Sequence, residues 1–252
     1  MTTTARVATA AALVLALAAC TSPPAEEKAT RTGTSTGIRL TAVLSSPVDI
    51  TLRWTGEERG AVGRVVEFAT EAKGPYTVLQ YVPPGQRTYH HPDLMPGTTF
   101  HYRLRPYYGP ASQPVEVALP PGGLSERHQR NDHEWAPPRT TGGRVVATHP
   151  VRDAASAPTE LKATVKHANG IHFTWTDHAA DEEAQLLEIR PAGSPAFRPA
   201  AVLDPGVDSF GLITLPEEKE ASYRIRAIAY GAQSNAVRLT TGARPTSSAT
   251  PR

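Results

Sequence analysis

The stretch HQRNDHEW, residues 128 to 135, gathers several side chains of the types that bind metal ions. They are His128, Asp132, His133 and Glu134, and the aromatic Trp135 follows them directly. Imidazole and carboxylate groups bind zinc, but a zinc site also needs fixed ligand spacing and neighbouring groups that orient the ligands. Prolines and glycines flank the stretch, and it has no helix or strand period. We therefore interpret it as a polar interdomain segment, with His128, His133 and Trp135 as candidate contacts to a partner.

Other groups of reactive residue types also lack a catalytic arrangement. His90, His91 and His101 alternate along predicted strands, and we expect them to be solvated. The acidic run DHAADEEA, residues 177 to 184, reads as a solvated loop. No nucleophile elbow, zinc-protease helix or phosphate-binding glycine loop occurs. The sequence predicts no enzyme activity, no metal and no cofactor.

The single cysteine of the chain, Cys20, has a different chemistry. It follows one arginine, Arg6, and an apolar run from Val7 to Ala19 that suits a signal-peptide core but is short for a membrane-spanning helix. The run ends in LAAC, residues 17 to 20, which resembles the bacterial lipobox. That resemblance implies cleavage before Cys20 and acylation of its thiol. Residues 1–19 are then a lipoprotein signal peptide, and the mature chain is anchored through Cys20 to the outer face of the bacterial cell membrane.

The termini and the charge balance limit the remaining possibilities. Residues 20–37 are rich in Thr, Ser, Pro and Gly and predict a flexible tether after the lipidated cysteine. Residues 242–252 have the same character and predict a disordered tail. The 26 basic and 24 acidic side chains nearly balance, so the composition gives no reason to expect nucleic acid as a partner.

Between these ends, short apolar-polar alternations predict strands. In residues 38 to 119 the runs are IRLTAVL, DITLRWT, GRVVEFAT, YTVLQYV, RTYHH, FHYRLRPYY and VEVAL. Turn signals such as KGP, PPG and MPGTT separate them. Seven such strands without a helical period indicate an all-β, immunoglobulin-like sandwich.

The same pattern occurs a second time at an offset of 121 residues. Trp54 falls on Trp175, Glu67 on Glu188, and the run YRLR on YRIR at residues 223–226. One residue of slip then aligns the last strand of each copy. Two modules follow, 38–119 and 157–241, and each tryptophan is expected at the centre of its core.

Both copies resemble fibronectin type III domains. The resemblance rests on LTA and LKA near the start, an apolar-x-apolar-x-Trp strand, and LMPGTTFHYRLRP in the first copy. It implies two tandem seven-stranded sandwiches over about two thirds of the chain.

Residues 120–156 form a connection longer than ordinary loops, and their apolar parts are Trp135 and RVVATH at 144–149. These parts either dock against a module, as an added edge strand, or stay exposed for a partner; we favour docking.

Two hypotheses about function remain. The first is a lipid-anchored, non-enzymatic interaction or spacer protein with a protein or glycan partner at the cell envelope. The second is an accessory carbohydrate-binding or hydrolase-associated surface lipoprotein, since fibronectin type III modules often accompany polysaccharide-degrading enzymes. Fold analogy alone does not choose between them.

Overall fold

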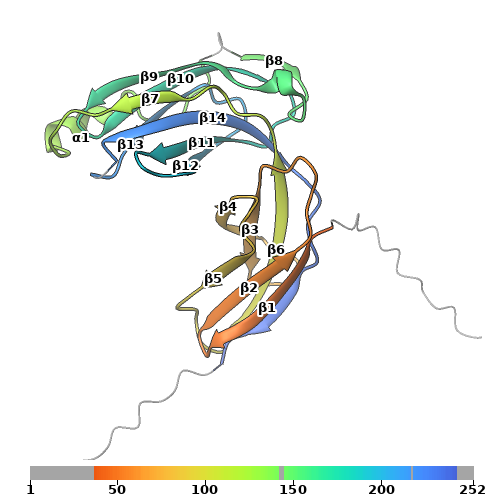
Figure 1. The fold of residues 1–252 in the computed structure, drawn as a ribbon. Helices are drawn as coiled ribbons and strands as arrows, with labels where there is room; N and C mark the ends of the chain where they lie inside the picture. The colour runs from red at the N-terminus through yellow and green to blue at the C-terminus, as the bar shows by residue number, and fades with distance from the viewer. Residues whose placement is uncertain (1–36, 142–144, 217, 243–252) are drawn as a thin grey trace, which may run out of the picture. The chain divides into compact units, whose positions relative to one another are not determined.

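The computed structural model describes residues 37–141, 145–216 and 218–242, and strands dominate it (Figure 1). The first repeat forms seven strands at the positions that the alternation predicts. They are β1 (Arg39–Ser46), β2 (Asp49–Thr55), β3 (Gly63–Ala69), β4 (Thr77–Val82), β5 (Thr88–His91), β6 (Thr99–Tyr108) and β7 (Val115–Ala118).

The second repeat also forms seven strands. They are β9 (Thr159–His167), β10 (Gly170–Ala179), β11 (Ala184–Pro191), β12 (Arg198–Leu203), β13 (Ser209–Ile213), β14 (Glu220–Tyr230) and β15 (Val237–Thr240). Between the repeats lie α1 (Glu126–Asp132), β8 (Val145–His149) and the short 3-10 helix η1 (Ala154–Ser156).

The N-terminal sandwich packs the sheet β1-β2-β5 against β4, β3, β6 and β15. Its core contains side chains from both sheets, including Leu40 and Leu52 on one side and Tyr102 and Leu104 on the other. Trp54 is 2% exposed and lies in this core, as the strand phase predicts.

The C-terminal sandwich packs β9, β10 and β13 against β12, β11, β14 and β7. Trp175 is fully buried in its core, and its indole N–H donates to Gln185 Oε1 at 3.0 Å. The prediction of an all-β protein with two seven-stranded sandwiches is confirmed by these pairings.

The two repeats exchange their last strands. The sequence repeat predicts that each copy supplies all seven strands of its own sandwich. Instead, β7 of the first repeat pairs with β14, from Val115 opposite Tyr223 to Ala118 opposite Glu220. Reciprocally, β15 of the second repeat pairs with β6. Figure 1 shows β7 lying beside β14. Each sandwich is therefore completed by a strand from the other repeat.

The same pair of hydrogen bonds precedes each exchanged strand. Ser112 donates its backbone N–H to Ile225 and accepts the Ile225 N–H on its hydroxyl. Ser234 forms the same two bonds with Leu104 in the other sandwich. Gly109 begins the crossing with a φ of +137°, and a Cβ there would overlap the Ala227 carbonyl oxygen. The crossing thus requires glycine at this position.

A third core forms where the repeats meet. The ends of β6 and β14 pair directly, with Tyr107 opposite Tyr230 and Tyr108 opposite Ala229. Around this pair, apolar side chains of both repeats are buried together. They include Val65, Tyr81, Tyr107, Ala184, Leu186 and Ile228. Each repeat contributes part of this core, so relative motion of the repeats would expose apolar surface.

The connection between the repeats docks on the C-terminal sandwich, as the sequence favoured. Strand β8 pairs in parallel with β10, with Val145 opposite Asp177 and His149 opposite Ala179. This confirms that Val145–His149 of the RVVATH run form an added edge strand, while Arg144 lies outside the described residues. The interpretation of residues 128 to 135 as lacking regular structure was wrong in part, because α1 covers their first half. That helix buries none of its residues, so it has no apolar period to detect.

Candidate functional site

The sequence-predicted interaction segment lies on helix α1 and in the turn that follows it. Ser125 caps the helix, and its hydroxyl accepts the backbone N–H of His128 at 3.3 Å. A serine at this position is a strong helix start. The cap places His128 and Asp132 one turn apart on the side that faces β9.

Two aromatic side chains of the segment pack on histidines of the C-terminal sandwich. His128 stacks on His167, with ring centroids 4.6 Å apart and planes within 10°. Trp135 meets His167 edge-on at 5.8 Å and His172 at 6.3 Å. Gly211 leaves room for this indole, because a Cβ there would lie 2.6 Å from Trp135 ring atoms. The structure therefore places His128 and Trp135 together in an intramolecular contact.

The hydrogen bonds of His167 identify its tautomer. Its Nδ1 accepts the backbone N–H of Asn169 at 3.2 Å, so this nitrogen carries no proton. Its Nε2 lies 3.0 Å from Asp132 Oδ1 and donates to that carboxylate. His167 is neutral in this arrangement. The Nδ1 atom of the stacked His128 is buried and has no partner among the described residues.

His133 is positioned differently. It caps the end of α1, is exposed, and its Nδ1 donates to the Arg130 carbonyl at 2.6 Å. Of the three residues that the sequence singled out, His133 is the one whose side chain faces solvent. The histidines that receive the segment, His167 and His172, were missed by sequence reasoning. Their signal is weak, since each occurs alone in an alternating strand.

Acidification is expected to release the segment. Burial lowers the pKa of His172, and Lys166 and Arg139 lower it further. Release removes the covering Trp135 and Arg139 while Lys166 stays on β9, so the pKa of His172 rises toward its ordinary value of 6.5 and the released state binds more protons. Docking therefore loses free energy as the pH falls through 6.5, and Trp135 emission should shift to longer wavelengths by pH 5.

Two variants check this prediction. The shift should vanish in Trp135→Phe, because the remaining tryptophans are buried in the cores. It should become smaller in His172→Gln, which removes the titrating ring. An equal shift in His172→Gln would contradict the assignment to His172.

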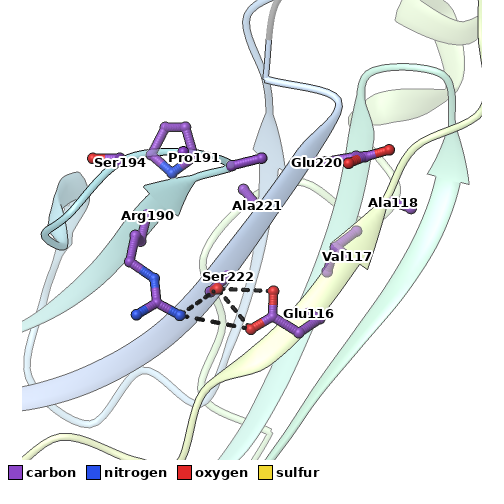
Figure 2. A pocket seen from close by; sticks show the side chains of 11 residues that line it. Glu116, Val117, Ala118, Arg190, Pro191, Ser194, Glu220, Ala221 and Ser222 are labelled. Carbon is purple, nitrogen blue, oxygen red and sulfur yellow. Dashed lines mark hydrogen bonds and ion pairs between the residues drawn. The ribbon is translucent and has the colours of Figure 1, made fainter.

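A polar groove of about 510 Å³ lies where β7 joins its host sheet (Figure 2). The Ser222 hydroxyl donates to the Glu116 carboxylate at 2.6 Å and accepts from the Arg190 guanidinium at 2.9 Å. Figure 2 shows these three side chains converging from β7, β14 and β11. The hydroxyl donates its single proton to Glu116, so this network holds the exchanged strand β7 on β14.

The histidines near β5 were interpreted as solvated, and this was wrong for His91. It is half-buried, and its ring packs edge-on against Phe68 and Tyr102. Its Nδ1 lies 3.0 Å from the Tyr102 hydroxyl. Burial lowers the pKa of His91, so this imidazole is part of the N-terminal core. His91 lies two residues after Tyr89, so the alternation of β5 places both side chains on the inner face.

The remaining predictions concern residues outside the description. Cys20, the signal peptide and almost all of the tether and tail lie outside the described residues. Within 37–141, 145–216 and 218–242, no helix has the length and apolar character needed to cross a membrane. In those same ranges, no three His, Cys, Asp or Glu side chains gather in a way that could hold a metal ion.

Comparisons with known proteins are consistent with this description but add no family. Neither a family model nor a curated protein matches the sequence. Among solved structures, a two-domain fibronectin type III segment of chicken tenascin is 13% identical, with 80% of this chain and 96% of that chain covered and a TM-score of 0.27.

Pectate lyase PelI from Erwinia chrysanthemi, solved with tetragalacturonic acid, is 18% identical and has a TM-score of 0.26. That match covers 27% of this chain and 23% of the lyase. With scores this low, the fold is assigned from the strand order and pairings described above. The chain is an all-β protein of two immunoglobulin-like sandwiches that share their last strands.

Proposed function

We propose that the chain is a non-enzymatic, lipid-anchored interaction or spacer protein on the outer face of a bacterial membrane. The anchor is Cys20, preceded by an apolar run and the small residues Ala18 and Ala19. The tether after it is free of large apolar side chains and lets the sandwiches stand away from the bilayer. The partner is a protein or a glycan of the cell envelope, and not a nucleic acid.

The observation that carries this proposal is the reciprocal exchange of β7 and β15. Two sandwiches joined by a single linker would move independently by default. Here each sandwich needs a strand of the other repeat, and a shared core lies between them. Such a unit keeps a fixed distance between its ends, which suits a spacer or a display platform.

Rigidity is measured with two spin labels on the full chain. Cys20→Ser removes the native thiol, and cysteines at the exposed positions Glu71 and Ala196 carry the labels. Pulsed electron resonance should give one narrow distance distribution. A broad distribution would contradict a rigid spacer.

Anchoring and partner are measured by crosslinking in cells followed by mass spectrometry. The native chain should fractionate with membranes, and Cys20→Ser should be released. Recovery of one envelope protein that is lost in the released variant supports the interaction role. If the native chain, which keeps Cys20, is also released from the membranes, the lipid anchor is contradicted.

The alternative is an accessory carbohydrate-binding surface lipoprotein. The observation that favours it is the open groove beside Glu116, Arg190 and Ser222, whose polar groups match sugar hydroxyls. Polysaccharide pull-down with the full chain distinguishes the two roles. Retention by wall polysaccharide with no protein captured in cells would favour the alternative.

A further inference from the structure

A second hollow, of about 460 Å³, lies away from the polar groove. Four parts of the chain enclose it: the connection from β2 to β3, the end of β6, the segment after β8, and β14. The side chains that matter for its chemistry are Arg59, Val62, Tyr108, Pro110, Arg152 and Arg226. Three of them are arginines, and none of the described residues that line the hollow is acidic. Its volume is in the range of small-ligand pockets.

One of the three arginines is compensated. The Arg226 side chain is 8% exposed, and its guanidinium lies 3.3 Å from Glu188 Oε2. A second N–H of the same group donates to the Gly109 carbonyl. Arg226 is therefore held in place at the bottom of the hollow, and Glu188 offsets its charge.

The other two arginines leave positive charge at the mouth. Arg59 and Arg152 are both exposed, and no ion pair joins either of them to an acid in the described part of the chain. Each of them brings one positive charge to the rim of the hollow. A concave site with a single sign of charge attracts ligands of the opposite sign.

Arg152 is held in place by its surroundings. Its guanidinium carbon lies 3.6 Å from the centre of the Tyr108 ring. The preceding residue, Val151, is fully buried and donates its N–H to Asp181 at 2.6 Å. A guanidinium stacked on a ring uses its face, so its N–H donors remain free in the plane. This is the geometry that receives a carboxylate or phosphate with two parallel bonds.

We propose that this hollow binds a small molecule or sugar that carries a carboxylate or a phosphate group. Arg152 and Arg59 hold the anionic group from two sides. Val62, Pro110 and the edge of Tyr108 contact the less polar part of the ligand. The proposal goes beyond the interaction or spacer role and does not depend on the lipid anchor, so the two can fail separately.

Isothermal titration tests the site on the full chain carrying Cys20→Ser. The probes are glucuronic acid, glucose 6-phosphate and glucose, which share a ring and differ in charge. We expect binding of at least one of the two acids, at least tenfold tighter than glucose. Raising the salt to 0.5 M should weaken it severalfold. The acid that binds more tightly identifies carboxylate or phosphate as the preferred group.

Variants locate the binding. The double variant Arg59→Ala with Arg152→Ala should bind the acid at least tenfold more weakly. Arg152→Lys should show most of this loss of affinity, because lysine cannot form the paired bonds. Arg53→Ala, an exposed arginine on β2, should bind as the parent does. Circular dichroism confirms that each variant is folded. Equal binding of glucose, no binding of either acid, or unchanged affinity in the double variant would overturn the proposal.

Discussion

Deleting residues 236–252, which removes β15, is expected to destabilise the N-terminal sandwich, although the deleted residues belong to the second repeat. Strand β15 pairs with β6 from Val237 opposite Tyr102 to Thr240 opposite Thr99. Val237 and Leu239 pack on the N-terminal core. Their loss removes roughly 1–3 kcal/mol for each side chain and leaves the edge of β6 unpaired. This is a large part of a typical stability of about 5–15 kcal/mol.

Hydrogen exchange read by mass spectrometry measures where the protection is lost. The deletion should increase amide hydrogen exchange far more in residues 39–108 than in residues 159–230. The matched change is Val117→Asp in β7, which puts a charge into the C-terminal core, where Val117 is 8% exposed. Val117→Asp should increase amide hydrogen exchange mainly in residues 159–230. Loss of protection in the repeat that carries each change, rather than in the other, would contradict the exchange.

The sequence was sufficient to predict the strands and their inward faces. Alternation places Leu52 and Trp54 on the same side of one strand, and the offset of 121 residues predicts Phe173 and Trp175 on the equivalent strand. All four are buried in the two cores. Period and burial are linked physically, because alternate side chains of a strand point to opposite faces.

The exchange could not be predicted, because the two repeats are too similar at the strand that receives it. VEVA at 115–118 and VRLT at 237–240 alternate in the same way, and each can pair with a strand that contains Tyr, Arg and an aliphatic residue. Local pattern therefore fits either pairing. The choice depends on the path of the chain after Gly109 and Gly231, which is a property of three-dimensional packing.

The candidate sites were predicted only in part. Docking of the connection followed from its apolar residues, because docking removes the Trp135 indole from water. The arginine-lined hollow was not predicted: Arg59 and Arg152 lie in separate connections, and no spacing rule brings them together. Composition does not help, since arginines on the surface are ordinary.

Neutralising Glu188 is expected to cost far more stability than neutralising Glu67, its equivalent in the first repeat. Glu188 Oε2 accepts from Arg224 Nε at 2.6 Å and lies 3.3 Å from the Arg226 guanidinium. Glu67 pairs with Arg103 at 2.6 Å and with Arg105 at 4.0 Å. The carboxylates are equally buried, so the difference lies in their partners.

The loss in free energy of unfolding depends on the arginine that is left without its carboxylate. Arg226 is 8% exposed, whereas Arg105 is 23% exposed and also lies 3.6 Å from Glu183. Glu188→Gln therefore leaves a buried charge without compensation, at about 3–5 kcal/mol. Glu67→Gln leaves charges that water and Glu183 can stabilise, at about 1 kcal/mol. Urea denaturation at pH 7 measures both losses.

A compensating variant separates the charge from the packing. Glu188→Leu combined with Arg226→Met removes the buried charge and keeps apolar volume, so it should recover most of the stability lost in Glu188→Gln. If the double variant is no more stable than Glu188→Gln, the hydrogen bonds of Arg226 to Gly109 and of Glu188 to Arg224 outweigh the buried charge. Equal losses in Glu188→Gln and Glu67→Gln would show that burial of the arginine is not the determining factor.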